Sequence, residues 1–169
     1  RHGFACVVPG PELPSYVFPD LFRKTYASVA AVNLSTLPPS SPDGGAGRPL
    51  VVHVPSRPQI KGTEELVRVV RSLQEEQDFD FELLTGVSRA AALDVMMRAD
   101  IVLDQFVIGS YGMVSLEAMA LCKPAVCYLT PAVQARVPPG FPVVSATRDN
   151  LRAVLGSLLR DAGERRRLG

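Results

Sequence analysis

The sequence ADIVLDQFVIGSYGMVSLEAMALCKPAVCY, residues 99–128, contains the pattern that decides the fold. Its apolar, β-branched start at residues 101–103 is typical of a strand buried on both faces of a sheet. Two glycines, Gly109 and Gly112, separate this strand from a run of helix formers at residues 113–121. A glycine loop that leads into a helix start offers free N–H groups and a favourable dipole to an anion. We therefore predict a strand, a phosphate-type loop and a helix in this stretch.

Strands and helices alternate on both sides of this stretch. The expected strands are residues 50–54, 79–84, 101–103, 125–128 and 141–145. The first expected helix is capped by Thr63, the second covers residues 88–98, and the third covers residues 113–121 and is stopped by Pro124. The fourth begins at Thr147 or Arg148 and ends in a solvated arginine run at 165–167. The loops 55–62 and 131–142 separate them. This alternation predicts an α/β, Rossmann-like parallel sheet with helices on both faces, whose ligands bind at the carboxyl edge of the strands.

The first 49 residues carry weaker patterns because prolines interrupt them repeatedly. We expect a short strand at 4–8, a helical turn at 21–26 and a second short strand at 29–32. Residues 37–47 have the composition of a linker. The predicted organisation is an irregular N-terminal segment and linker at 1–49, the remnant of another domain, followed by a Rossmann-like domain at 50–169.

Composition narrows the possible functions. The chain has 169 residues, 47% of them hydrophobic, which is enough for one domain with a sizeable core. Its net charge of +1 and the lack of a basic stripe argue against nucleic acid as a partner. Three cysteines indicate free thiols in a reducing compartment, and two histidines are too few for a histidine metal site. There is no apolar run of membrane-spanning length. The abrupt ends lead us to expect a piece of a longer protein.

Cations at the end of the first predicted strand of the domain suit a diphosphate. Ser56, Arg57 and Lys61 lie in this loop. A guanidinium can bind two phosphate oxygens at once, and an ammonium acts as a point charge. Neither a P-loop motif nor a Gly-x-Gly-x-x-Gly motif is present. Ordinary surface charge is the alternative explanation for these residues.

The predicted helix at 113–121 offers two further groups to a ligand. The amides of Gly112, Met113 and Val114 could hold phosphate oxygens, unless the loop is only a tight turn. Glu117 stands among apolar residues, and ribose hydroxyls could donate to it, unless it simply faces solvent. Asp104 is the other acid of this edge, and an Asx turn is its alternative role.

Two segments resemble a known family. VHVPSRPQIKGT, residues 52–63, resembles the first strand and phosphate loop of the C-terminal half of GT-B glycosyltransferases. YGMVSLEAMALCKPAV, residues 111–126, resembles the Glu-x7-Glu region of the large retaining group in that family. The resemblance covers roughly residues 50–169.

The resemblance implies the nucleotide-sugar donor half of a two-domain hexosyltransferase. Arg57 and Lys61 would neutralise the donor diphosphate during catalysis, and Glu117 would hold the ribose. The full set of predicted donor-binding residues is Ser56, Asp104, Gly109, Tyr111, Gly112, Met113, Val114 and Glu117. No cofactor or bound metal is expected, since the nucleoside diphosphate sugar is a substrate and the cations take the leaving-group charge. A missing N-terminal domain would hold the acceptor. We expect a cytoplasmic protein whose contact with the inner face of a membrane, if any, runs through that domain.

The sequence departs from the family pattern at two positions. The first glutamate of the motif should stand eight residues before Glu117, where this chain has Gly109. Asp104 could replace it if the loop folds back. Cys122 stands where the motif has glycine, and only local repacking is expected there.

Other functions remain open at this point. A GT-B sugar-nucleotide epimerase would share the fold but normally brings more acids and histidines to its cleft. A degenerate domain that only binds a nucleotide sugar or a partner protein would account for Gly109. A response-regulator-like module fits less well, because residues 50–54 carry no acid.

Overall fold

The computed structural model describes residues 2–10, 12–13, 17–18, 20–28, 30–40 and 47–169. Its main sheet has five parallel strands in the order β4-β3-β5-β6-β7. Their bounds are β3 (Leu50–His53), β4 (Asp80–Leu83), β5 (Ile101–Leu103), β6 (Ala125–Cys127) and β7 (Val143–Ser145). All five strands were predicted, to within about two residues. The α/β, Rossmann-like fold class is confirmed.

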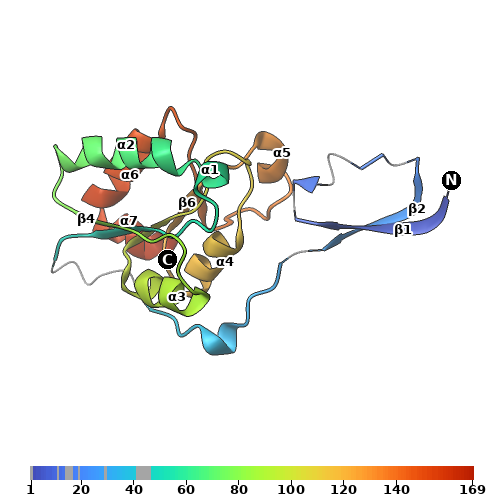
Figure 1. Cartoon of the computed structure of the whole chain (residues 1–169), viewed down its shortest axis with the longest axis horizontal. Coiled ribbons are helices and arrows are strands. Elements are labelled where there is room, and N and C mark those ends of the chain that lie inside the picture. The colour runs from blue at the N-terminus through green and yellow to red at the C-terminus, as the bar shows by residue number, and fades with distance from the viewer. Residues whose placement is uncertain (1, 11, 14–16, 19, 29, 41–46) are drawn as a thin grey trace.

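Helices cover both faces of this sheet (Figure 1). They are α1 (Pro58–Lys61), α2 (Thr63–Gln74), α3 (Arg89–Arg98), α4 (Met113–Ala120), α5 (Pro131–Gln134), α6 (Leu151–Arg160) and α7 (Ala162–Leu168). In Figure 1, α2 and α6 lie on one side of the strands, and α3 and α4 lie on the other. The helices predicted at 88–98 and 113–121 are confirmed as α3 and α4.

Alternate residues of the central strand divide the core between the two faces. Ile101 and Leu103 of β5 pack with the buried faces of α2 and α6. Val102, between them, packs with residues of α3 and α4. Because neighbouring side chains of a strand point to opposite faces, a fully apolar run has both faces covered.

Local details differ from the sequence-based expectations in the loops. Thr63 was expected to cap α2, but the cap is Gly62 in a left-handed conformation, and Thr63 is the first helical residue. The hydroxyl of Thr63 bonds instead to Nε2 of His53, at 2.8 Å. The two loops at 55–62 and 131–142 contain the short helices α1 and α5. In both helices a proline stands at the first position, where its missing N–H is harmless.

The C-terminal arginine run does not end the fourth predicted helix. That helix, α6, stops at Arg160, and the side chain of Asp161 caps α7 by accepting from the Glu164 amide at 2.8 Å. Arg165 is buried rather than solvated, and Nη1 donates to the carbonyls of Leu158 and Leu159 at 2.7 and 2.9 Å. A guanidinium is well placed there, because the last carbonyls of a helix lack intrahelical donors.

The first part of the chain contains a second, two-stranded parallel sheet that extends away from the main one (Figure 1). Its strands are β1 (His2–Pro9) and β2 (Phe22–Ser28). The strand predicted at 4–8 is confirmed within β1, and the helical turn predicted at 21–26 is wrong, since those residues lie largely in β2. Of the strand predicted at 29–32, residue 29 lies outside the described residues and 30–32 form no strand.

Part of the predicted linker packs against the domain. Leu37 follows a short 3-10 helix, η2 (Leu34–Thr36). Its side chain is 2% exposed and belongs to the core cluster that also contains buried apolar residues of α3 and α4. The amide of Ser40 donates to the Leu121 carbonyl at 3.1 Å. Residues 41–46 lie outside the described part of the chain. A domain boundary near residue 49 stays a prediction, but residues 37–40 are held by the Rossmann-like domain.

Cys122 adopts a left-handed conformation, with φ 56°, at the end of α4. A Cβ atom makes this conformation unfavourable, whereas glycine tolerates it. We expect Cys122→Gly to raise the free energy of unfolding by about 0.5–1 kcal/mol, after the greater chain entropy of unfolded glycine is subtracted. Urea denaturation measures the change. Cys122→Ala is the control, because it keeps the strain and should bring no gain. An unchanged or lower stability for Cys122→Gly would contradict the explanation.

Candidate functional site

A cavity of about 510 Å³ lies at the carboxyl edge of the sheet. It is bordered by the ends of β3 and β4 and by the starts of α3 and α4, from which Val54, Pro55, Ser56, Leu84, Gly86, Val87, Ser88, Arg89, Ala92, Met113, Val114 and Glu117 line it. The chain runs from β3 to the edge strand β4 and then back to β5 on the other side of β3. In open α/β sheets such a reversal is where ligands bind. The volume is within the range of small-molecule sites.

Glu117 is the buried carboxylate of this cavity. It lies in α4, is 6% exposed, and accepts from Nε of Arg89 through Oε1 at 2.6 Å. The solvent-facing alternative for Glu117 is therefore wrong. A buried carboxylate requires a cation or hydrogen-bond donors, and Arg89 at the first position of α3 provides one. The cavity thus contains one matched pair of charged groups.

Asp104 forms a second cluster of charged and polar groups beside the cavity. Its carboxylate is fully buried and pairs with Nζ of Lys61 through Oδ1 at 2.5 Å. Oδ2 accepts from the Gly112 amide at 2.9 Å, the Ser115 amide at 3.3 Å and the Ser115 hydroxyl at 2.6 Å. Asp104 therefore acts as a built-in anion at the start of α4. It occupies part of the site that the sequence suggested for a phosphate.

The remaining helix-start amides are those of Met113 and Val114. The first N–H groups of a helix have no intrahelical acceptor. Gly112 and Ser115 donate to Asp104, while Met113 and Val114 line the cavity and have no acceptor among the described residues. A Cβ at Gly112 would lie 3.0 Å from both the Asp104 carboxylate and Lys61 Nζ, so a larger residue would crowd this pair. The structure thus brings Lys61, Asp104 and Gly112 into direct contact.

The other predicted site residues are placed differently. Ser56 lines the cavity. Arg57 is exposed at the start of α1, and its side chain makes no hydrogen bond or ion pair with another described residue. Tyr111 packs against the small apolar cluster around Leu129 and Val133, and its ring lies tilted by 44° to the ring of Phe141 at a centroid distance of 5.0 Å. Burial raises the pKa of Tyr111, and the nearby charge of Glu12 adds to the shift.

Gly109 is buried and has φ +80°. A Cβ at this position would come within 2.4 Å of the Thr130 methyl and 3.1 Å of the Tyr128 ring. Its carbonyl accepts from the Thr130 amide at 2.8 Å. The backbone here therefore has no room for the acid that the family motif carries.

Two more buried groups near the site are inert. Burial lowers the pKa of His53, whose ring bonds to the Leu103 carbonyl at 2.9 Å and to the Thr63 hydroxyl, so the ring is neutral and satisfied. Burial raises the pKa of the Cys127 thiol to about 12, and the Asp104 charge contributes. Neither is a nucleophile or a base at neutral pH. The structural role predicted for His53 agrees with these contacts.

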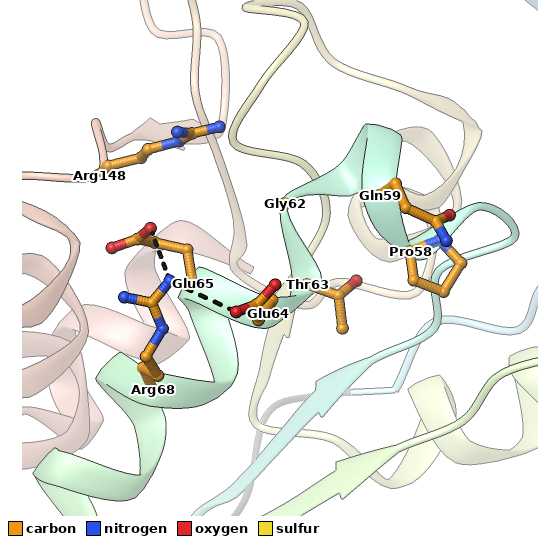
Figure 2. A pocket seen from close by; sticks show the side chains of 8 residues that line it. All are labelled: Pro58, Gln59, Gly62, Thr63, Glu64, Glu65, Arg68 and Arg148. Atoms are coloured by element: carbon orange, nitrogen blue, oxygen red, sulfur yellow. Dashed lines mark hydrogen bonds and ion pairs between the residues drawn. The ribbon is translucent and has the colours of Figure 1, made fainter.

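A second hollow of about 500 Å³ lies at the start of α2 (Figure 2). Figure 2 shows Glu64 and Glu65 turned toward Arg68, at 3.8 and 3.2 Å, with Arg148 across the opening. Of the ten residues predicted to bind the donor, none lines this hollow. The side chains of Glu64, Glu65 and Arg68 are exposed and paired with each other, and Arg148 is exposed as well, so these charged groups offer a ligand no buried partner.

Comparisons with known proteins bear on the fold. No family model and no curated protein matches the sequence. Among solved structures, the chain is similar to sucrose-phosphate synthase from Thermosynechococcus elongatus, with a TM-score of 0.68 and 17% identity over 97% of this chain and 51% of the other. It is also similar to TarM, with a TM-score of 0.63 and 11% identity over 96% of this chain and 36% of the other. A TarM mutant from S. aureus, solved with UDP among its ligands, is similar with a TM-score of 0.64 and 10% identity over 98% of this chain and 40% of the other.

The chain has the fold of one half of a GT-B glycosyltransferase. At these identities the likeness establishes the fold alone. The chain spans about half, or less, of the length of the solved structures that it matches. Within the described residues, no helix combines the length and apolar character that a membrane span needs. Those residues also contain no group of three or more His, Cys, Asp or Glu side chains that could hold a metal ion.

Sequence reasoning missed two residues of the candidate site. Arg89 was not singled out, although an arginine at the first position of a helix is an unfavourable choice near the positive end of the dipole. Ser115, which donates twice to Asp104, was also missed. Its position three residues after Gly112 in the glycine-loop helix was a weak signal, because a first-turn serine often has only a local role.

Proposed function

We propose that this chain is the donor-binding part of a glycosyltransferase that transfers a sugar from a nucleoside diphosphate to an acceptor. The observation that carries the proposal is the buried Glu117 carboxylate in a cavity at the strand-order reversal, next to the amides of Met113 and Val114, which have no acceptor in the described part of the chain. A nucleoside needs an acceptor for its ribose hydroxyls, and a diphosphate needs N–H groups and cations. The GT-B-type fold agrees with this proposal, and UDP is a ligand of one structural neighbour.

The chain's groups fit successive parts of the donor in this proposal. Glu117 would accept from the ribose through Oε2, the oxygen that Arg89 does not use. The amides of Met113 and Val114 would meet phosphate oxygens, since the donors beside them are taken by Asp104. The Lys61 ammonium has three N–H groups and would bridge Asp104 and the diphosphate.

Arg57 has a larger share of the diphosphate charge in this proposal than the sequence suggested. The Lys61 charge is balanced by Asp104 at 2.5 Å, so the pair is close to neutral when viewed from a phosphate. Arg57 is exposed and unpaired among the described residues. When the bond between the anomeric carbon and the diphosphate oxygen breaks, Arg57 and the helix amides would stabilise the leaving group.

The acceptor site belongs to a part of the protein outside this chain in our proposal. The two-stranded sheet β1–β2 supports this, because parallel strands normally have both faces covered. Val7 and Tyr26 on these strands are 63% and 51% exposed. A missing domain that adds strands and helices to this ribbon would bury them and complete the cleft.

Binding without transfer is the second candidate function, and Gly109 favours it, because a side chain at the position of the first motif glutamate would be crowded by Thr130 and strained by the left-handed backbone. The epimerase alternative gains no support from the cavity. Glu117 is the sole acid among the described lining residues, and no histidine is among them. Turnover of a nucleotide sugar by the complete protein separates transfer from binding alone.

Calorimetry of this chain with UDP, GDP and ADP tests donor binding. We expect at least one of them to bind, and Glu117→Gln to weaken that binding about tenfold or more, because a charged acceptor is lost. Glu82→Gln is the matched control, since Glu82 pairs with Arg98 on the surface away from the cavity. Failure of all three nucleotides to bind at millimolar concentration would exclude the donor site.

A further inference from the structure

We propose that Arg89 is a specificity-determining residue that forms, together with Glu117, a clamp for a ribose hydroxyl and thereby rejects deoxyribonucleotides. The inference rests on the proposed donor-binding function and concerns the same cavity. The observation behind it is the contact between Arg89 Nε and Glu117 Oε1, at 2.6 Å, inside the lining of that cavity.

The two side chains leave complementary groups unused. Glu117 Oε2 and the Arg89 Nη atoms have no hydrogen-bond partner among the described residues. Glu117 Oε2 is not sealed from solvent, and the Arg89 side chain is 59% exposed. A carboxylate only accepts hydrogen bonds, and a guanidinium only donates them. A hydroxyl does both. It can therefore donate to Oε2 of Glu117 and accept from an Nη group of Arg89 at the same time, which a hydrogen atom in its place cannot do.

Helix electrostatics indicate that Arg89 is not there to stabilise α3. It is the first residue of that helix, where the dipole disfavours a cation. Arg98, in the last turn of the same helix, has the favourable position and pairs with Glu82 on the surface. A cation at the unfavourable end gains its stabilisation from the carboxylate of Glu117, which is 7% exposed in its side chain.

The capped start of α3 fixes the backbone position of Arg89. Ser88 caps this helix, and its hydroxyl accepts from the Ala91 amide at 3.2 Å. Arg89 follows directly and crosses to α4 through its contact with Glu117. Because the carboxylate is held through one oxygen, the direction of the other oxygen is also set. The clamp is thus assembled before a ligand enters, which favours discrimination between similar ligands.

Deoxy analogues test the clamp. The probe is whichever of UDP, GDP and ADP binds the chain most tightly, compared by calorimetry with its 2′-deoxy and 3′-deoxy forms. We expect the wild type to prefer the ribonucleotide over at least one deoxy form by about tenfold or more. Arg89→Ala should weaken ribonucleotide binding and leave the binding of that deoxy form nearly unchanged, so that the preference shrinks toward unity. Arg89→Lys should retain part of it, since one ammonium replaces a planar group with several donors.

Controls separate this inference from the donor proposal and from misfolding. Arg98→Ala removes an arginine from the same helix and should keep the full preference. Arg89→Gln is the second variant if Arg89→Ala does not fold, as judged by its thermal transition. If no nucleotide binds the wild type, the donor proposal fails and the clamp with it. If the ribonucleotide binds and Arg89→Ala keeps the preference, or binds the ribonucleotide more tightly, the clamp is wrong and the donor proposal stands.

Discussion

Replacing Asp104 by alanine is expected to lower the free energy of unfolding by about 3–5 kcal/mol, because it leaves a buried ion pair without one partner. The carboxylate is fully buried and pairs with Lys61, which is 13% exposed in its side chain. Its other oxygen accepts from the Gly112 amide and from the Ser115 amide and hydroxyl. Without Asp104, the ammonium and these donors lose their acceptor in a site that water reaches poorly. Chemical denaturation measures the loss.

Two further variants give this expectation its controls. Asp94→Ala removes an exposed aspartate from α3 and should change stability by less than about 0.5 kcal/mol. Asp104→Asn keeps an acceptor for the Gly112 amide but removes the charge that faces Lys61, and should cost less than alanine. A double-mutant cycle with Lys61→Met then isolates the pair. A loss for Asp104→Ala no larger than that for Asp94→Ala would show that the cluster does not hold the loop.

The same contacts argue against a direct contact between Asp104 and the transferred sugar. The sequence suggested that Asp104 could replace the missing motif glutamate by folding back toward the transferred sugar. Its carboxylate is instead enclosed by Lys61 and the start of α4, with no exposed side-chain surface. A sugar would therefore have to displace those contacts in order to reach it. We expect Asp104 to position Lys61 and the glycine loop for the donor rather than to touch the sugar.

Gly109→Glu, which introduces the acid of the motif that the sequence resembles, is expected to destabilise the protein by about 2–5 kcal/mol. The backbone at Gly109 is left-handed, and a Cβ would lie 2.4 Å from the methyl group of Thr130. That methyl cannot rotate away freely, because the Thr130 hydroxyl oxygen accepts from the Val133 amide at the start of α5. The added acid therefore strains the loop before it can reach a ligand. Thermal and urea unfolding measure the change.

Gly140→Ala separates the two contributions to this loss. Gly140 has φ +78° but nothing within 4 Å of its Cβ position, so alanine there reports the left-handed conformation alone, at about 1 kcal/mol. Gly109→Ala should cost more than Gly140→Ala. Thr130→Ser removes the crowding methyl and keeps the capping oxygen, so it should recover part of the loss in a Gly109→Ala background. Equal losses at the two glycines, or a Gly109→Glu variant as stable as the wild type, would contradict the crowding.

Most of the sheet and its helices could be predicted, because burial leaves a periodic record in the sequence. Strand β5 is short and wholly apolar because both of its faces are covered. The apolar spacing in α2 and α6 follows from the face that each turns to the sheet. The failures lie where local preference and tertiary context disagree. Strand β2 forms by pairing with β1, and no local sequence pattern in its residues predicts that pairing. Helix α6 ends because Asp161 caps the start of α7, and this cap competes with the continuation of α6 as one long helix.

The sequence by itself determined the α/β order, the glycine loop and the placement of Lys61, Asp104, Gly112 and Glu117 at one edge of the sheet. Those features follow from hydrophobic period and from the rule that loops after parallel strands share an edge. Only the tertiary structure decided which charges meet. It paired Asp104 with Lys61 and Glu117 with Arg89, residues separated by 43 and 28 positions, and it left no uncrowded space for a Cβ atom at Gly109. Such pairings depend on distances of a few ångströms between separate elements, which no local pattern of residues encodes.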